Sequence, residues 1–341
     1  MAEQNRVAGN TLRTSRILDK ATIRNLSRKS DVMGIFLILH CWGVIFGAMA
    51  LFYVFPNPLT CILAVMLIGA RQLGLGILMH DGAHNALFKT RMFNDLLSNI
   101  FCAWPILANT GEYRHYHLKH HAFTQQDQDP DVVLSDQFPV SPASFRRKML
   151  RDLTGQTAYQ QRLMQIKMAL GSADAPAGQK FARAVSELGP FALVNTAILI
   201  ACTVLFHWSY YLMFWVLPLM TSYMAVLRLR NIAEHAFVPD KDDPLRNTRT
   251  TRVNLLERVF IAPYWVNYHI EHHLLMHVPC FRLPEIHHHL MDTGQGPKME
   301  LVNGFKNIIR ASCSGSDDDP GRPMRTQSLV GTLSGGFNKN V

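Results

Sequence analysis

The chain has 341 residues, of which 48% are hydrophobic and only 17% are charged. Soluble domains carry about 25% charged residues, and the apolar residues here gather in a few long runs, so the composition favours an integral membrane protein. The formal charge of +9 is not accompanied by a basic patch interleaved with aromatic residues in a soluble fold, so nucleic-acid binding is not expected.

In chain order, residues 1–30 are polar and contain seven Lys or Arg residues, which predicts a basic, cytoplasmic N-terminal segment. Residues 31–310 form the predicted membrane domain. A stretch at 96–108 is apolar but too short to cross a bilayer, so we expect it at the interface or as a re-entrant segment. Residues 311–341 are rich in Ser, Gly and Asp and predict a disordered tail. Four apolar runs are long enough to span the membrane, at about 33–55, 59–79, 189–206 and 210–227.

The connections between these runs predict the topology. The short connections 56–58 and 207–209 contain no Lys or Arg, whereas residues 80–187 contain twelve and the stretch from 228 onward contains fourteen. Because cytoplasmic loops carry the excess of basic residues, both termini and the long polar segments are expected in the cytoplasm. The predicted fold is therefore an all-α integral membrane protein, with four transmembrane helices in two hairpins and a cytoplasmic helical cap.

Histidines form four groups in the chain. There are sixteen histidines, and on a helix residues three and four positions apart share a face, so each group can direct its side chains toward one point. Imidazole suits iron, copper and zinc. The groups are HDGAH with His80 and His84, a first HxxHH with His117, His120 and His121, NIAEH with Asn231 and His235, and a second HxxHH with His269, His272 and His273.

The number and place of these histidines indicate a two-metal centre. Nine imidazoles exceed the roughly four to six ligands that one ion takes. All four groups fall on the predicted cytoplasmic side, although the topology was argued from charge alone. A centre there can meet a lipid chain from the bilayer and an electron donor from the cytosol, and no residue beyond the metal ligands is expected to be catalytic.

With these histidine motifs, the chain resembles the membrane fatty acid desaturase superfamily over about residues 33–290. That superfamily also contains related hydroxylases. The resemblance implies two iron ions, O2 as co-substrate, four membrane helices and an acyl chain held in a kinked apolar tunnel. It implies an O2-dependent desaturase that introduces a double bond into the acyl chain of a lipid. The implied ligands are His80, His84, His117, His120, His121, His235, His269, His272 and His273, with Asn231 acting through water.

Two departures refine this expectation. No HPGG haem motif is found, so electrons are expected from a separate ferredoxin or b-type cytochrome. The second HxxHH motif begins with His269, where front-end desaturases have Gln. A carotenoid- or alkane-type hydroxylase of the same superfamily remains an alternative. A non-enzymatic metal transporter is another, although its ligands would lie near the middle of the membrane, where Arg71 is the one ionic residue within the spans.

Several neighbouring residues have two interpretations. Asp81, Glu112, Glu234 and Glu271 either orient the imidazoles or are solvated charges. Arg71 is either functional or paired inside the bundle. We expect a solvated turn for Asp127, Asp129 and Asp131, surface or supporting places for His277, His287, His288 and His289, and packing or interfacial places for His40 and His207. His115 is an alternative ligand to His117, and the six cysteines are expected to be small buried side chains.

Overall fold

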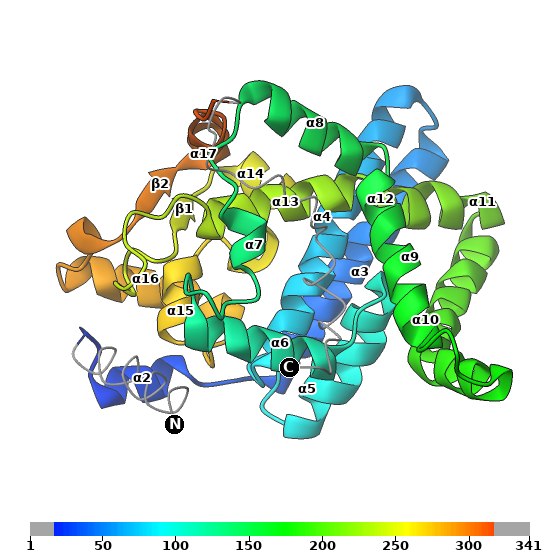
Figure 1. Ribbon diagram of the computed structural model, residues 1–341, viewed down its shortest axis with the longest axis horizontal. Coiled ribbons are helices and arrows are strands. Elements are labelled where there is room, and N and C mark those ends of the chain that lie inside the picture. The colour runs from blue at the N-terminus through cyan, green and yellow to red at the C-terminus, as the bar shows by residue number, and fades with distance from the viewer. Residues whose placement is uncertain (1–16, 317–341) are drawn as a thin grey trace.

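The computed structural model describes residues 17–316 (Figure 1). Most of the predicted N-terminal segment and C-terminal tail therefore lies outside the described residues. Four helical runs are long and apolar enough to cross a membrane, as the sequence predicts. They are α3 (Asp31–Val54), α4 (Pro58–Ala83), α10 (Ala177–Leu205) and the run Trp208–His235, which comprises α11 (Trp208–Tyr211), the π-helical η3 (Leu212–Val216), α12 (Leu217–Met220) and α13 (Ser222–His235).

The helices extend beyond the apolar runs that predicted them. α4 continues four residues past Met79, and the last run continues to His235. Hydropathy stops at the first polar residues, but these polar ends are buried against other helices and retain their backbone hydrogen bonds. The histidines at 80 and 235 are therefore held on long helices, which fixes their directions.

Local sequence explains why α4 begins where it does. The Asn57 side chain accepts a hydrogen bond from the Thr60 backbone N–H at 3.1 Å. The Thr60 hydroxyl oxygen in turn accepts from the Asn57 backbone N–H at 3.3 Å. Pro58 occupies the first turn, where its missing N–H costs nothing. Residues 55–57 can therefore reverse the chain between α3 and α4.

α4 lies at the centre of the membrane-spanning helices. In its most apolar window 67% of the residues are buried, against 11% for α10. At Gly69 the backbone of α4 approaches α13 so closely that an added Cβ would lie 2.2 Å from Ser222 Oγ. The Ser222 hydroxyl donates to the Val65 carbonyl at 2.9 Å. This contact fixes α4 and α13 side by side, and the histidines follow farther along both helices.

The remaining elements form the polar part of the molecule. One departure from the all-α expectation is a parallel pair of short strands, β1 (Thr250–Arg252) and β2 (Leu301–Asn303). The apolar stretch 96–108 forms short helical pieces instead of one span, and all six cysteines are free, four of them buried. The helices are α2 (Lys20–Leu26), α5 (Arg91–Ser98), η1 (Asn99–Ala103), η2 (Trp104–Ile106), α6 (Thr110–Phe123), α7 (Val132–Ser135), α8 (Pro142–Leu153), α9 (Gln156–Leu170), α14 (Leu255–Phe260), η4 (Pro263–Trp265), α15 (His269–Leu274), η5 (Cys280–Arg282), α16 (Leu283–Asp292), η6 (Gly296–Lys298) and α17 (Gly304–Ser312).

Candidate metal centre

The nine histidines predicted from the four motifs meet at the ends of α4, α6, α13 and α15. They form two groups, in each of which the potential ligand atoms lie within 4.8 Å of one another. The groups adjoin, because the rings of His121 and His273 stack with centroids 4.2 Å apart. The five-histidine group comprises His80, His84, His117, His121 and His272, and the four-histidine group comprises His120, His235, His269 and His273.

Each HxxHH motif is divided between the two groups, which corrects the expectation that its three imidazoles aim at one point. On an α-helix the i and i+4 positions are separated by about 40° and the i+3 position lies about 60° to the other side. His117 and His121 therefore join the five-histidine group, while His120 joins the other. In α15, His269 and His273 belong to the four-histidine group, whereas His272 belongs to the five-histidine group.

The distances between ring nitrogens fit metal coordination. His117 Nε2 and His121 Nε2 are 3.0 Å apart, as are His121 Nε2 and His272 Nε2. In the other group, His235 Nε2 and His269 Nε2 are separated by 2.8 Å. Metal–imidazole bonds of about 2.0–2.1 Å place neighbouring donors about 3.0–3.4 Å apart. The residues therefore fit a pair of imidazole-bound ions.

Several buried polar atoms at the centre have no hydrogen-bond partner among the described residues. Such atoms are rare unless a ligand or an ion satisfies them. Both ring nitrogens of His84 are of this kind, and burial lowers the pKa of His84 well below its usual range. Burial likewise lowers the pKa of His117, His121, His269, His272 and His273, which favours the neutral, metal-binding form. The other unpartnered atoms are His80 Nε2, His117 Nδ1, His235 Nδ1 and Asn231 Nδ2.

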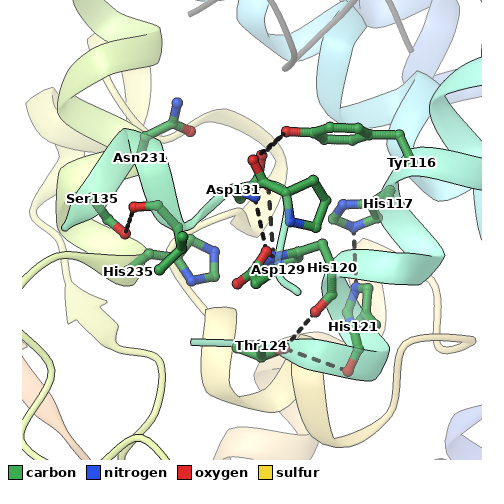
Figure 2. Close-up of polar contacts among 12 residues, drawn as sticks. Tyr116, His117, His120, His121, Thr124, Asp129, Asp131, Ser135, Asn231 and His235 are labelled. Atoms are coloured by element: carbon green, nitrogen blue, oxygen red, sulfur yellow. Dashed lines mark hydrogen bonds and ion pairs between the residues drawn. The ribbon is translucent and has the colours of Figure 1, made fainter. Parts of the chain in front are cut away.

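Asp129 supports the four-histidine group, so the expectation of a solvated turn is wrong for this residue. Its Oδ1 lies 2.8 Å from His120 Nδ1, and only 4% of the residue is exposed. Asp131 Oδ2 lies 3.7 Å from the same nitrogen, and Asp131 Oδ1 accepts a hydrogen bond from the Tyr116 hydroxyl (Figure 2). Burial opposes protonation of His120, but Asp129 and then Asp131 outweigh it and raise its pKa. Asp127 is exposed, as expected.

Two of the four ambiguous carboxylates orient histidines. Glu234 Oε2 lies 3.4 Å from His269 Nδ1 and forms an ion pair with Arg230 at 2.5 Å. Asp81 Oδ1 lies 3.5 Å from His80 Nδ1, and its other oxygen accepts from the Cys280 backbone N–H at 2.7 Å. Carboxylates in these places hold imidazole rings in the orientation that a metal needs.

Glu271 is buried, but its carboxylate contacts residues that are not candidate metal ligands. It accepts from the Thr250 hydroxyl and lies next to His287 Nδ1, both at 2.5 Å. It thereby connects α15 to β1 and to α16. His287 is buried in this supporting place, while His288 is exposed. Glu112 lines a separate cleft near Arg183 at the α6–α10 junction.

The other histidines lie outside both groups. His115 is exposed and lies outside both groups, so the structure favours His117 as the ligand from the first HxxHH motif. His277 Nδ1 lies 3.2 Å from the His84 carbonyl oxygen. His207 caps α11, and His40 Nδ1 lies 2.9 Å from the Tyr264 hydroxyl. These are the packing and supporting places that the sequence predicts.

Arg71 is paired inside the protein. Its Nη2 donates to the Val259 carbonyl at 2.6 Å, and its guanidinium carbon lies 5.6 Å from the centre of the Tyr264 ring. Only 6% of Arg71 is exposed. Arg71 therefore ties α4 to α14 through Val259 and to η4 through Tyr264.

Two small adjoining cavities, of about 30 and 10 Å³, lie beside His80. Ile77, His80, Arg230 and Val266 line both of them. The larger cavity is also lined by residues of α4, α6 and α13, namely Leu73, Gly76, Tyr113, Tyr223 and Leu227. A molecule placed there would touch His80 of the five-histidine group.

Comparison with known proteins agrees with this architecture. The family model described as "Fatty acid desaturase" matches residues 56–301, which include all four histidine-bearing segments. The dihydrorhizobitoxine desaturase of Bradyrhizobium elkanii is 29% identical over 268 residues, which are 75% of this chain and 74% of that protein.

Proposed function

Because the chain belongs to the fatty acid desaturase family, we propose that it is an O2-dependent di-iron desaturase that introduces a double bond into an aliphatic chain, with the acyl chain of a lipid as the expected substrate. The single observation that carries this proposal is the meeting of nine histidines from four separate segments in two adjoining groups. The related activity of hydroxylation uses the same centre, whereas a metal transporter does not fit the family.

The proposed ligands are the nine histidines of the two groups. Asn231, whose Nδ2 is buried without a partner among the described residues, would contact the second ion through water. When bound, two iron ions would supply the activation of O2 and the removal of hydrogen from an unactivated C–H bond. The protein orients the imidazoles through Asp81, Asp129 and Glu234 and keeps the centre buried.

The overall reaction defines what else is needed. Two hydrogens leave neighbouring carbons, and O2 is reduced to two waters. Two of the four electrons come from the substrate, and two come from outside together with two protons. We propose that a separate ferredoxin or b-type cytochrome delivers these electrons.

We propose that the centre faces the cytoplasm, where both termini would also lie. The support is the distribution of Lys and Arg, which are missing from residues 56–58 and 207–209 and frequent in the segments that carry the histidines. In this arrangement α3 and α4 form one transmembrane hairpin, and α10 with the following run forms the other.

The test combines metal analysis with product analysis. Purified protein is expected to contain about two irons per chain with magnetically coupled spectra. Lipids and small metabolites from cells with and without the gene are then compared by mass spectrometry. A product two hydrogens lighter supports desaturation, and a product one oxygen heavier supports hydroxylation. Protein that binds exchangeable zinc and causes neither change would contradict the proposal.

A further inference from the structure

The cavities beside His80 are lined in part by residues to which the proposed desaturase function gives no role. Arg230 lines both cavities, and its side chain is 12% exposed. Its Nε pairs with Glu234, while its Nη1 is 3.4 Å from Asn231 Oδ1, a long contact. A guanidinium has five N–H donors, so this arginine retains donors for another acceptor.

Tyr223 adds a second donor to the same wall. It is 2% exposed, and its hydroxyl has no hydrogen-bond partner among the described residues. Arg230, on the same helix, lines the same cavity. A buried hydroxyl without a partner is unfavourable, so an acceptor is expected to meet it when the cavity is filled.

The charge at the centre favours the same kind of occupant. Every ligand candidate in the two groups is a histidine, and neutral imidazoles would leave the charge of two bound cations to be balanced by neighbouring anionic groups. The carboxylates of Asp81, Asp129 and Glu234 already contact His80, His120 and His269. An anion in the cavity would balance this positive charge.

The size of the two cavities limits the length of the apolar part of the occupant. Leu73, Ile77, Leu227 and Val266 supply apolar walls, and cavities of about 30 and 10 Å³ suit a short apolar group better than a long one. Farther along α4, the close contact of Gly69 with Ser222 leaves no space between α4 and α13 at that level. A chain that extended from the cavity toward Gly69 would therefore have to separate α4 from α13.

We infer that the substrate is a short aliphatic molecule with a free carboxylate, which Arg230 and Tyr223 bind beside the five-histidine group. The inference rests on the proposed desaturase function and narrows its substrate class. Since Arg230 and His80 line the same cavity, the carbons that are oxidised lie within a few bonds of the carboxylate. An acyl group esterified to a lipid or bound to a carrier lacks this charge.

Binding under anaerobic conditions tests the inference without turnover. The full iron-loaded chain in nanodiscs is titrated with hexanoate and with methyl hexanoate. We expect hexanoate to bind at least about tenfold more tightly, because the ester leaves the guanidinium and the hydroxyl unsatisfied. Equal affinities, or displacement of hexanoate by lower concentrations of methyl stearate, would overturn the inference.

Two variants separate carboxylate binding from structural support. Tyr223→Phe removes one oxygen and is expected to reduce the preference for hexanoate at least about threefold, while two irons per chain are retained. Arg230→Gln is expected to abolish the preference, and Arg230→Lys to restore part of it. Arg282→Gln, at a solvent-exposed pair with Glu285, is the matched control and leaves the preference unchanged. An unchanged preference in Tyr223→Phe contradicts the assigned site.

The two proposals fail in different ways. If the chain desaturates a long acyl ester and shows no preference for the free acid, the substrate inference fails and the desaturase function stands. If the chain contains no coupled iron pair and consumes no O2 with any substrate, the desaturase function itself fails.

Discussion

Asp129 Oδ1 lies 2.8 Å from Nδ1 of His120, and both side chains are buried. This carboxylate fixes the ring so that Nε2 points to the four-histidine group, where it lies 3.4 Å from His273 Nε2. Aspartate in this place makes the imidazole a better metal ligand. The contact therefore extends the candidate site beyond the histidine motifs.

Asp129→Asn is expected to weaken metal binding by about 10–100-fold, because the amide cannot supply the negative charge that supports His120. The measurement is iron content per chain after dialysis against graded concentrations of chelator. Asp127→Asn, two residues earlier on the exposed part of the same loop, is the matched control. Equal iron retention in both variants would show that Asp129 does not support the metal.

His235→Ala leaves three histidines in the four-histidine group. The iron content is expected to fall from about two to below about one per chain, with loss of desaturation, because three imidazoles hold one ion less tightly and both positions share α6 and α15. His115→Ala removes an exposed imidazole and is expected to retain both ions. Metal analysis by mass spectrometry checks both variants, and loss of iron from His115→Ala would argue for the alternative ligand.

Glu271→Gln is expected to destabilise the fold by about 1–3 kcal/mol, because a buried carboxylate contacts both Thr250 and His287 and the amide satisfies them less well. Thermal unfolding in detergent provides the measurement. Glu285→Gln, at a carboxylate whose side chain is 46% exposed, is the control and is expected to have little effect. A melting temperature in Glu271→Gln equal to that of the control would rule out this role.

Gly69→Ala is expected to cost about 1–3 kcal/mol, because the new Cβ would lie 2.2 Å from Ser222 Oγ. Gly47→Ala places the same methyl group on α3, where no atom lies within 4 Å, and is expected to be neutral or slightly stabilising. The midpoint of thermal unfolding in detergent is compared for the two variants. Combining Gly69→Ala with Ser222→Gly should recover part of the loss, and no recovery would place the strain elsewhere.

The sequence predicts the four apolar helices and all nine histidines, because both depend on local patterns. Hydropathy over about twenty residues identifies a span, and spacings of three and four residues identify a helical face. The same local patterns place the ends of α4 and α10 less well. The last turn of α4 is polar but buried, so tertiary contacts let that helix continue past the apolar run. α10 begins at Ala177, twelve residues before the predicted span, in a polar and largely exposed segment that hydropathy does not identify.

The sequence does not predict how the histidines are shared, or which carboxylates support them. The division of each box follows from the directions of α6 and α15 toward each other, which no single motif contains. Asp129 lies nine residues after His120 in a loop that contains Pro130, a context that usually indicates a solvated turn. Only the return of that loop onto α6 makes the carboxylate buried, so a local rule could not distinguish it from Asp127.

The division of the HxxHH motifs has a consequence for the assembly of the centre. Each of α6 and α15 contributes to both groups, so neither metal position exists as a separable module. An ion bound in one position would hold the two helices that complete the other, and a second ion would then meet a preformed set of ligands. Loading is therefore expected to be cooperative, with chains that hold both ions or neither outnumbering those that hold one.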